Sequence, residues 1–260
     1  MKQPTAPLTL LSRIEDAGLN ASAPPQQRWV DGWLVRFCPG RARRARCVNA
    51  VAAGRLSMQE KFALCQQVFD DAQLPLIFRI TPLSQPDRLD SWLEGLGLLK
   101  SAEARVMVNA DLASVEPEPL PQGLGLQRVG HTAFAQIVGQ LRGSPLAQQQ
   151  AHAQRLELSP VPFEGWVLRR SGESAVLACG QTAAEADMVG LYDVFTAPDA
   201  RNNGWARKLC AHLLDRARRR NARVGYLQVD ADNLPARAVY RRLGFDDAYG
   251  YHYRTTTPDA

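Results

Sequence analysis

The stretch Val194-Phe195-Thr196-Ala197-Pro198-Asp199-Ala200-Arg201-Asn202-Asn203-Gly204-Trp205-Ala206 decides the fold of this 260-residue chain. It has the pattern of a strand end, a short loop and the start of a basic helix. The first turn of a helix has unpaired N–H groups and the positive end of the helix dipole. Gly204 removes the side chain where an anion must approach the backbone. The segment therefore predicts a phosphate cradle, although it lacks the G-K-[ST] and G-x-G-x-x-G patterns of nucleotide-binding loops.

The residues after this loop predict a helix from about 204 to 220. Their apolar positions follow the i, i+3, i+4, i+7 spacing of an amphipathic helix, and they are Ala206, Leu209, Cys210, Leu213, Leu214 and Ala217. A strand at 224–229 and a second helix at 234–243 come next. Asn233 is placed to cap this second helix, which carries Tyr240 and ends at Gly244.

Elements of both types alternate through the rest of the chain, which indicates the α/β class. Upstream of the loop we expect a strand at 124–129, a helical stretch at 131–156 broken at 143–145, and strands at 166–170, 175–181 and 188–196. Residues 245–253 form one or two final strands. The N-terminal half predicts a short first helix, a strand at 33–37, a helix at 57–72, a strand at 76–80, a helix at 87–96 and a strand at 104–108. This order echoes the later part of the C-terminal half and suggests an internal repeat.

Residues 116–123 contain three prolines in eight residues. Prolines at alternating positions disfavour a helix and suit an extended linker. We therefore expect two domains, at residues 1–118 and 119–260.

The two motifs of the C-terminal half, taken in order, resemble the GNAT acetyltransferase superfamily. Arg201-x-x-Gly204-x-Ala206 is similar to its pyrophosphate-binding motif, with Ala206 in place of the commoner final glycine. A second set is similar to its N-x-x-A-x-x-x-Y-x-x-x-G-F element, namely Asn233, Ala236, Tyr240, Gly244 and Phe245. The resemblance covers nearly all of residues 124 to 253.

This resemblance implies a mixed central sheet flanked by helices, preceded by a smaller, degenerate GNAT-like α/β domain. It implies acetyl-CoA as the acyl donor, with no metal, and a site built entirely from residues 121 to 260. Acetyl-CoA would lie where the strand ending near Thr196 diverges from the strand ending near Val229. The implied cofactor-binding residues are Val194, Phe195, Thr196, Arg201, Asn202, Asn203, Gly204, Trp205, Ala206 and Asn233.

The implied reaction is direct attack of a primary amine on the thioester, in a ternary complex. A phenol hydroxyl can protonate a departing thiolate, and the resemblance gives this role to Tyr240. A base must take a proton from the amine; Asp193 is the first candidate, and Asp187 and Glu185 are the others. The structural alternatives are a core aromatic for Tyr240 and a loop cap or arginine partner for Asp193. The functional alternative is a catalytically silent regulatory module that binds acetyl-CoA.

The N-terminal half lacks these motifs. Residues 39–49 contain no R-x-x-G-x-G/A, and Leu93 falls where the repeat would place Tyr240. Leucine cannot donate a proton. We therefore expect this half to bind no cofactor productively, to pack against the catalytic half and to shape the substrate entrance.

Composition narrows the remaining function classes. No apolar stretch approaches the ~20 residues of a membrane span, and the N-terminus lacks the apolar core of a secretory signal, so we expect a soluble cytoplasmic protein. The five cysteines include no C-x-x-C pair and the four histidines lack metal-ligand spacing. The net charge of +5 is clustered, but no nucleic-acid recognition motif accompanies it. A small-molecule or peptide amine is the expected partner; its identity is open, and a homodimer is compatible with the sequence.

Overall fold

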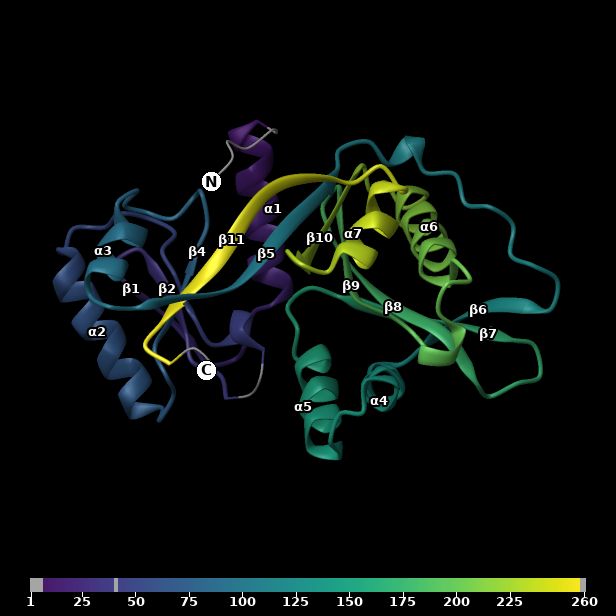
Figure 1. Cartoon of the computed structure of the whole chain (residues 1–260), viewed down its shortest axis with the longest axis horizontal. Helices are drawn as coiled ribbons and strands as arrows, with labels where there is room; N and C mark the ends of the chain where they lie inside the picture. Colours follow the sequence, from purple (N-terminus) through teal and green to yellow (C-terminus); the bar gives the residue numbers. More distant parts are fainter. Residues whose placement is uncertain (1–6, 40–41, 258–260) are drawn as a thin grey trace.

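The computed structural model describes residues 7–39 and 42–257. Gly40 and Arg41, from the segment 39–49 that lacks the phosphate-binding motif, lie outside the described residues. The N-terminal half contains α1 (Leu8–Ala21), β1 (Gln27–Val30), β2 (Trp33–Arg36), β3 (Val48–Asn49), α2 (Met58–Asp71), β4 (Ile77–Ile80), α3 (Leu89–Gly95) and β5 (Leu99–Asn109). The C-terminal half contains β6 (Leu124–Val129), α4 (His131–Arg142), α5 (Leu146–Glu157), β7 (Phe163–Arg170), β8 (Val176–Glu185), β9 (Met188–Thr196), α6 (Trp205–Arg218), β10 (Val224–Asp230), α7 (Leu234–Arg241) and β11 (Asp246–Thr255). Figure 1 shows their arrangement.

These elements confirm the α/β class and most predicted segments. β6 and β9 have the predicted bounds, and the helical stretch at 131–156 is broken between α4 and α5 as expected. Ser57 and Glu60 form the capping box of α2. The final segment is one strand, β11. Two strands were missed, β1 and β3, because runs of four and two residues are too short to show a period.

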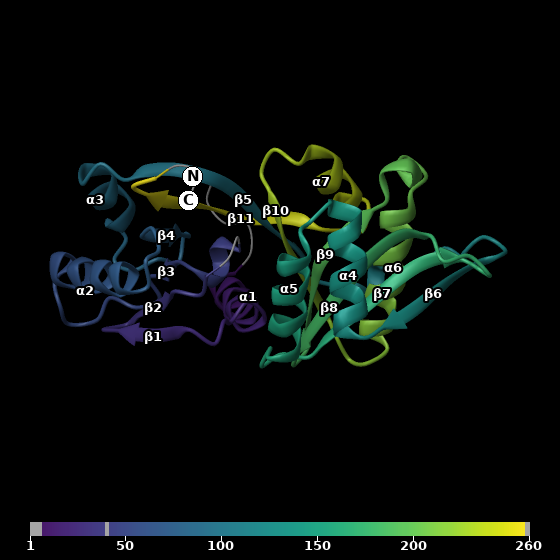
Figure 2. The same ribbon diagram turned by 90° about the horizontal axis from the view of Figure 1, so that it is seen from below.

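Helices cover both faces of the C-terminal part of the sheet, because side chains alternate along its strands. Val167 and Cys179 face Phe134 of α4 in one buried cluster. Their neighbours Leu168 and Ala178 pack in a second cluster that includes α6 and α7. Figure 2 shows α4 and α5 on one side of β7–β9 and α6 on the other.

One sheet of eleven strands runs through the described residues, in the order β1-β2-β3-β4-β11-β5-β10-β9-β8-β7-β6. β5, from the N-terminal half, lies between β10 and β11 and is antiparallel to both. β11, from the end of the chain, lies between β5 and β4. These two long strands cross the middle of the molecule together (Figure 1). The sheet therefore runs without a break past the predicted boundary between residues 118 and 119.

The proline-rich linker at 116–123 forms neither helix nor strand. It lies along α6, where Glu118 accepts hydrogen bonds from Arg207 (2.8 Å) and Lys208 (2.5 Å). The carbonyl of Glu118 also contacts the His212 ring at 3.0 Å. These contacts hold the linker against the C-terminal half.

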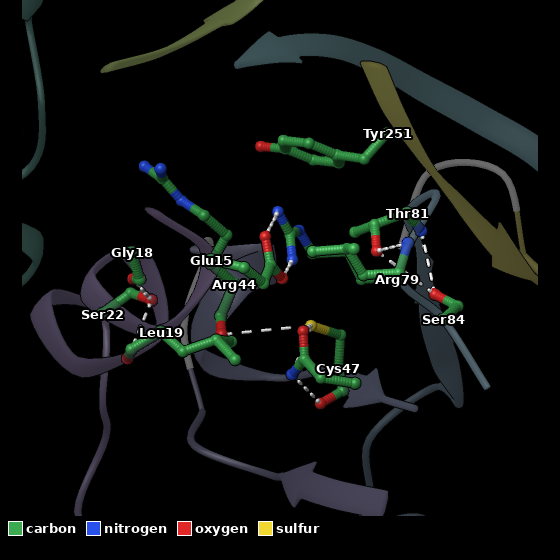
Figure 3. A network of polar contacts seen from close by, with 12 residues as sticks. Glu15, Gly18, Leu19, Ser22, Arg44, Cys47, Arg79, Thr81, Ser84 and Tyr251 are labelled. Carbon is green, nitrogen blue, oxygen red and sulfur yellow. Dashed lines mark hydrogen bonds and ion pairs between the residues drawn. The ribbon is translucent and has the colours of Figure 1, made fainter. Parts of the chain in front are cut away.

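A buried ion pair joins α1 to the middle of the sheet. Glu15 on α1 pairs with Arg79 on β4, and their side chains are 13% and 3% exposed. Tyr249 donates its hydroxyl to Glu15, and the Arg79 guanidinium lies 4.1 Å from the centre of the Tyr251 ring. Figure 3 shows Glu15, Arg79 and Tyr251 together. A buried charge pair is stable only when surrounding groups compensate both ions, and here the carboxylate of Glu15 and the ring of Tyr251 face the Arg79 guanidinium, although its Nε has no hydrogen-bond partner among the described residues.

We expect Glu15→Gln to lower the free energy of unfolding by about 3 kcal/mol at pH 7, because it leaves the Arg79 charge buried and uncompensated. Burial alone would raise the pKa of Glu15, but the charge and hydrogen bond of Arg79 lower it below its usual 4.5. A lowered pKa in the folded state stabilises above pH 4.5, and this stability is lost as the pH falls through the folded-state pKa. Urea unfolding at pH 7 and at pH 4 measures both effects.

The matched control is Glu173→Gln, an exposed carboxylate in the turn between β7 and β8. It is expected to change stability by less than ~0.5 kcal/mol. Wild type and Glu15→Gln should converge in stability as the pH falls. Equal loss of stability in both proteins over this range would show that Glu15 is not a source of the acid sensitivity.

Candidate active site

A cavity of about 560 Å3 lies where the two halves meet. Its walls include the C-terminal end of α1, residues of the segment 38–45, one side of α5, the ends of β9 and β10, and the start of α7. Residues of both halves therefore line this cavity, whereas the sequence predicted a site built entirely from residues 121 to 260. The physical reason is the position of β5 between β10 and β11, and of β11 between β5 and β4. This pairing brings the N-terminal half against the C-terminal part of the sheet.

The cavity lies where β9 and β10 diverge. The two strands pair in parallel over Met188–Leu191 and Val224–Leu227. Beyond these residues the described structure has no further pairs between them, although β9 continues to Thr196 and β10 to Asp230. The divergence falls where the sequence predicted it, and it opens a gap between two strand ends with exposed backbone groups.

A bulge in β9 directs side chains into this gap. The pairing of β8 with β9 shifts register between Cys179 and Gln181, opposite Asp193. Asp193 itself has a φ of +49°, which is uncommon for a residue with a side chain. A bulge bends a strand and changes the direction of its side chains. As a result, Asp193 and Val194 both line the cavity.

Two helices converge on the Asp193 carboxylate. Arg142, from the end of α4, donates to Oδ1 at 2.9 Å, and Nε2 of His152 on α5 lies 3.2 Å from Oδ2. Burial alone would raise the pKa of Asp193, but the hydrogen bond from His152 and the charge of Arg142 lower it far below its usual range. Asp193 is therefore an ionised carboxylate with both oxygens engaged.

Sequence reasoning missed His152 and Arg142. The His152 side chain is 12% exposed, lines the cavity and packs edge-on against Phe134. No local pattern links residues 142, 152 and 193. The helical spacing shows only that His152 and Arg155 lie on the same side of α5.

Tyr240 lies in the cavity wall on α7 and is 8% exposed. Its ring packs against Phe245. Within the described residues its hydroxyl has no hydrogen-bond partner. Burial raises the pKa of Tyr240, with a smaller contribution from nearby Cys210, so the phenol keeps its proton at neutral pH. It is both a core aromatic and a free proton donor beside the cavity.

Asn233 is confirmed as the cap of α7, because its side chain accepts a hydrogen bond from the backbone N–H of Ala236 at 3.2 Å. It also lines the cavity. The cap places this side chain at the junction of β10 and α7, next to the diverging strands. Its predicted contact with the cofactor stays a prediction.

The predicted phosphate cradle starts α6. Gly204 precedes the helix in the left-handed region, with a φ of +72°. A Cβ added to Gly204 would meet no atom within 4 Å, so the space beside its backbone is open. The Arg201 guanidinium lies over the Phe195 ring, and Asn203 donates to the Arg201 carbonyl at 2.9 Å. The free N–H groups of the first helical turn can therefore donate hydrogen bonds to an anion such as a pyrophosphate.

The described residues support neither a metal site nor a nucleophilic cysteine. These residues contain no group of three or more histidine, cysteine and acidic side chains that could hold a metal ion, and none of their helices could span a membrane. Cys179 and Cys210 are buried, and burial raises the pKa of each thiol to about 12. Both are therefore poor nucleophiles at neutral pH.

Comparison with solved structures identifies the fold. A GCN5-related N-acetyltransferase from Kribbella flavida superposes with a TM-score of 0.68 at 15% identity, covering 94% of each chain. A tandem GNAT protein from the clavulanic acid biosynthesis pathway has a TM-score of 0.64 at 14% identity, covering 78% of this chain and 70% of its own. These TM-scores show a shared GNAT fold, as predicted.

Comparison with curated sequences finds shorter matches. The [ribosomal protein bS18]-alanine N-acetyltransferase of Escherichia coli K12 is 33% identical over 81 residues, which are 31% of this chain and 53% of that enzyme. The chain thus spans about half the length of this relative. The mycothiol acetyltransferase of Saccharomonospora viridis is 28% identical over 193 residues, 63% of each chain.

A family model covers nearly the whole chain. The model described as "Probable histone acetyltransferase Rv0428c C-terminal" matches residues 11–254, from α1 to the end of β11. The match includes both halves of the sheet, the cavity and the cradle. The protein therefore belongs to this family of the GNAT superfamily.

Proposed function

We propose that this protein transfers an acetyl group from acetyl-CoA to a primary amine, by direct attack in a ternary complex. One observation supports this most strongly: the cavity opens where β9 and β10 diverge, with Tyr240 and the Asp193–His152 pair in its walls. The names of two relatives describe acetyl transfer, one of them to an alanine of a ribosomal protein.

The residues present fit acetyl-CoA. Backbone groups of Val194, Phe195 and Thr196 would pair with its pantetheine arm, because this end of β9 has no partner in β10. Backbone N–H groups of the cradle at 201–206 would hold the pyrophosphate, and Asn233 would contact the arm from the start of α7. Bound acetyl-CoA supplies an acetyl group activated as a thioester.

Tyr240 acts as the general acid in this proposal. Its proton is retained at neutral pH, its hydroxyl is not engaged by the described residues, and it lines the cavity at the diverging strands. A phenol held in this way can protonate the thiolate that leaves when the carbon–sulfur bond breaks.

Asp193 acts in proton removal through His152. A doubly paired carboxylate with a lowered pKa is a weak base, so Asp193 alone would accept the amine proton poorly. Its hydrogen bond to Nε2 of His152 orients the ring and leaves Nδ1 with its lone pair. We assign Nδ1 of His152 as the atom that takes the proton from the amine as the carbon–nitrogen bond forms.

We expect His152→Gln to lower kcat about 100-fold with little change in acetyl-CoA affinity, because glutamine keeps a polar contact with Asp193 but cannot accept the proton. Steady-state thiol release across pH 6 to 9 measures it. The control is His212→Gln, whose ring contacts the linker and not the cavity. If raising the pH alone restored His152→Gln to the wild-type rate, solvent would be the base.

A screen of amines with acetyl-CoA, read by release of free thiol, tests the function itself. Thiol release that depends on both substrates supports the transferase. The alternative is a catalytically silent regulatory module, and it would bind acetyl-CoA without releasing thiol with any amine.

We further propose that the N-terminal half binds no cofactor. Leu93 on α3 is fully buried in its core, where it cannot donate a proton to a ligand. The role of this half is then to supply the strand β5 to the shared sheet and to form one wall of the cavity.

A further inference from the structure

Two arginines lie in the cavity wall, one from each half of the protein. Arg44 comes from the N-terminal half and Arg155 from α5, and both line the cavity. Neither forms an ion pair within the part of the chain that the structure describes. In Figure 3 the Arg44 guanidinium extends away from the Glu15–Arg79 pair and has no marked contact. The third arginine of the cavity, Arg142, is neutralised by Asp193.

The two unpaired guanidinium groups are close enough to interact. Burial lowers the pKa of Arg155, Asp193 and Cys38 raise it, and the positive charge of Arg44 makes a smaller contribution that lowers it. The other acidic side chain of the cavity is Asp230, at the end of β10 beside Asn233. The wall formed by α5 and the N-terminal segment is therefore positive. Two partly buried like charges are costly to hold together without an anion.

These arginines lie apart from the residues that would hold the cofactor phosphates. No residue of the cradle at 201–206 lines the cavity, whereas Arg44 and Arg155 do. Arg155 follows His152 by three positions on α5, so the two side chains share one side of the helix. An anion bound by Arg155 would thus lie about one helical turn from the proposed base.

We propose that Arg44 and Arg155 bind an anionic group, a carboxylate or a phosphate, on a small amine acceptor. This inference rests on the proposed acetyl transfer. A guanidinium holds either group through paired, charge-assisted hydrogen bonds. The positive wall also repels polycationic acceptors, so a lysine-rich peptide is a poor substrate.

Matched amine pairs test the acceptor class. Phenylalanine is compared with 2-phenylethylamine, which lacks the carboxylate, and O-phosphoethanolamine with ethanolamine, which lacks the phosphate. We expect the anionic member of at least one pair to have a kcat/KM about 10- to 100-fold higher, the range of a charge-assisted contact. The pair with the larger ratio identifies the anion. Equal rates within both pairs, or a preference for the uncharged member, would overturn the proposal.

Variants test the two arginines directly. Arg44→Gln with Arg155→Gln is expected to reduce the preference within the favoured pair to roughly one. The control Arg170→Gln removes an exposed charge at the end of β7 and should keep the preference. Titration with acetyl-CoA checks that each variant is folded. If the double variant kept the preference and instead weakened acetyl-CoA binding, the arginines would belong to the cofactor site and the proposal would fail.

A readout without transfer separates this inference from the proposed function. Cys38 lines the cavity, whereas the other four cysteines are buried. The favoured anionic amine, added without acetyl-CoA, should slow the labelling of Cys38 by maleimide in wild type and not in the double variant. Protection of Cys38 without any turnover would support the anion site and contradict the proposed acetyl transfer. Turnover without amine preference or protection would keep the transferase and refute the anion site.

Discussion

Replacing Gly204 by glutamate is expected to weaken acetyl-CoA binding by roughly 100-fold or more, the largest effect on affinity that we expect from a single substitution. Gly204 has a φ of +72°, where any side chain is strained, and it starts the helix whose free N–H groups form the cradle. Glutamate adds a negative charge where the pyrophosphate would lie. Isothermal titration calorimetry measures the affinity and the number of sites.

The control is Gly172→Glu, in the turn between β7 and β8. Gly172 has a φ of +81° and equally open surroundings, so this substitution brings the same strain and charge to a turn that is not part of the cradle. It should leave binding unchanged. Binding of one acetyl-CoA, lost only in Gly204→Glu, would support the C-terminal site and an empty N-terminal half. Two sites would refute the non-binding role proposed for the N-terminal half, and no binding by wild type would refute the transferase.

Tyr240→Phe is expected to lower kcat about 1000-fold while the affinity for acetyl-CoA stays nearly unchanged. The substitution removes the hydroxyl that would protonate the thiolate and keeps the ring that packs against Phe245. Because the Tyr240 hydroxyl has no partner within the described residues, its loss should cost little stability. Single-turnover kinetics with a good acceptor measure the chemical step directly.

Tyr253→Phe is the matched control. Tyr253 on β11 is also buried, at 5% exposed, and its hydroxyl has no hydrogen-bond partner among the described residues, but it does not line the cavity. It should keep wild-type turnover. Equal turnover in Tyr240→Phe and wild type would remove Tyr240 from the mechanism and leave a core aromatic in its place.

Much of the fold and part of the site could be predicted because they depend on neighbours along the chain. A glycine before an amphipathic helix predicted the open start of α6, and Asn233 three residues before Ala236 predicted the cap of α7. Short apolar runs between turn residues predicted β6 and β9 with their observed bounds. In each case the deciding interaction spans only a few residues.

The sequence by itself therefore determined the α/β class, the GNAT-like order of elements, the open helix start at Gly204 and the position of Tyr240 on its helix. Only the tertiary structure decided that β5 and β11 share the middle of one sheet, since strand pairing between distant segments leaves no local pattern. That pairing brings Arg44 to the same cavity as Arg155, and helix packing brings His152 to Asp193. The electrostatics of the site depend on these distances between remote residues, which are fixed by packing and not by spacing along the chain.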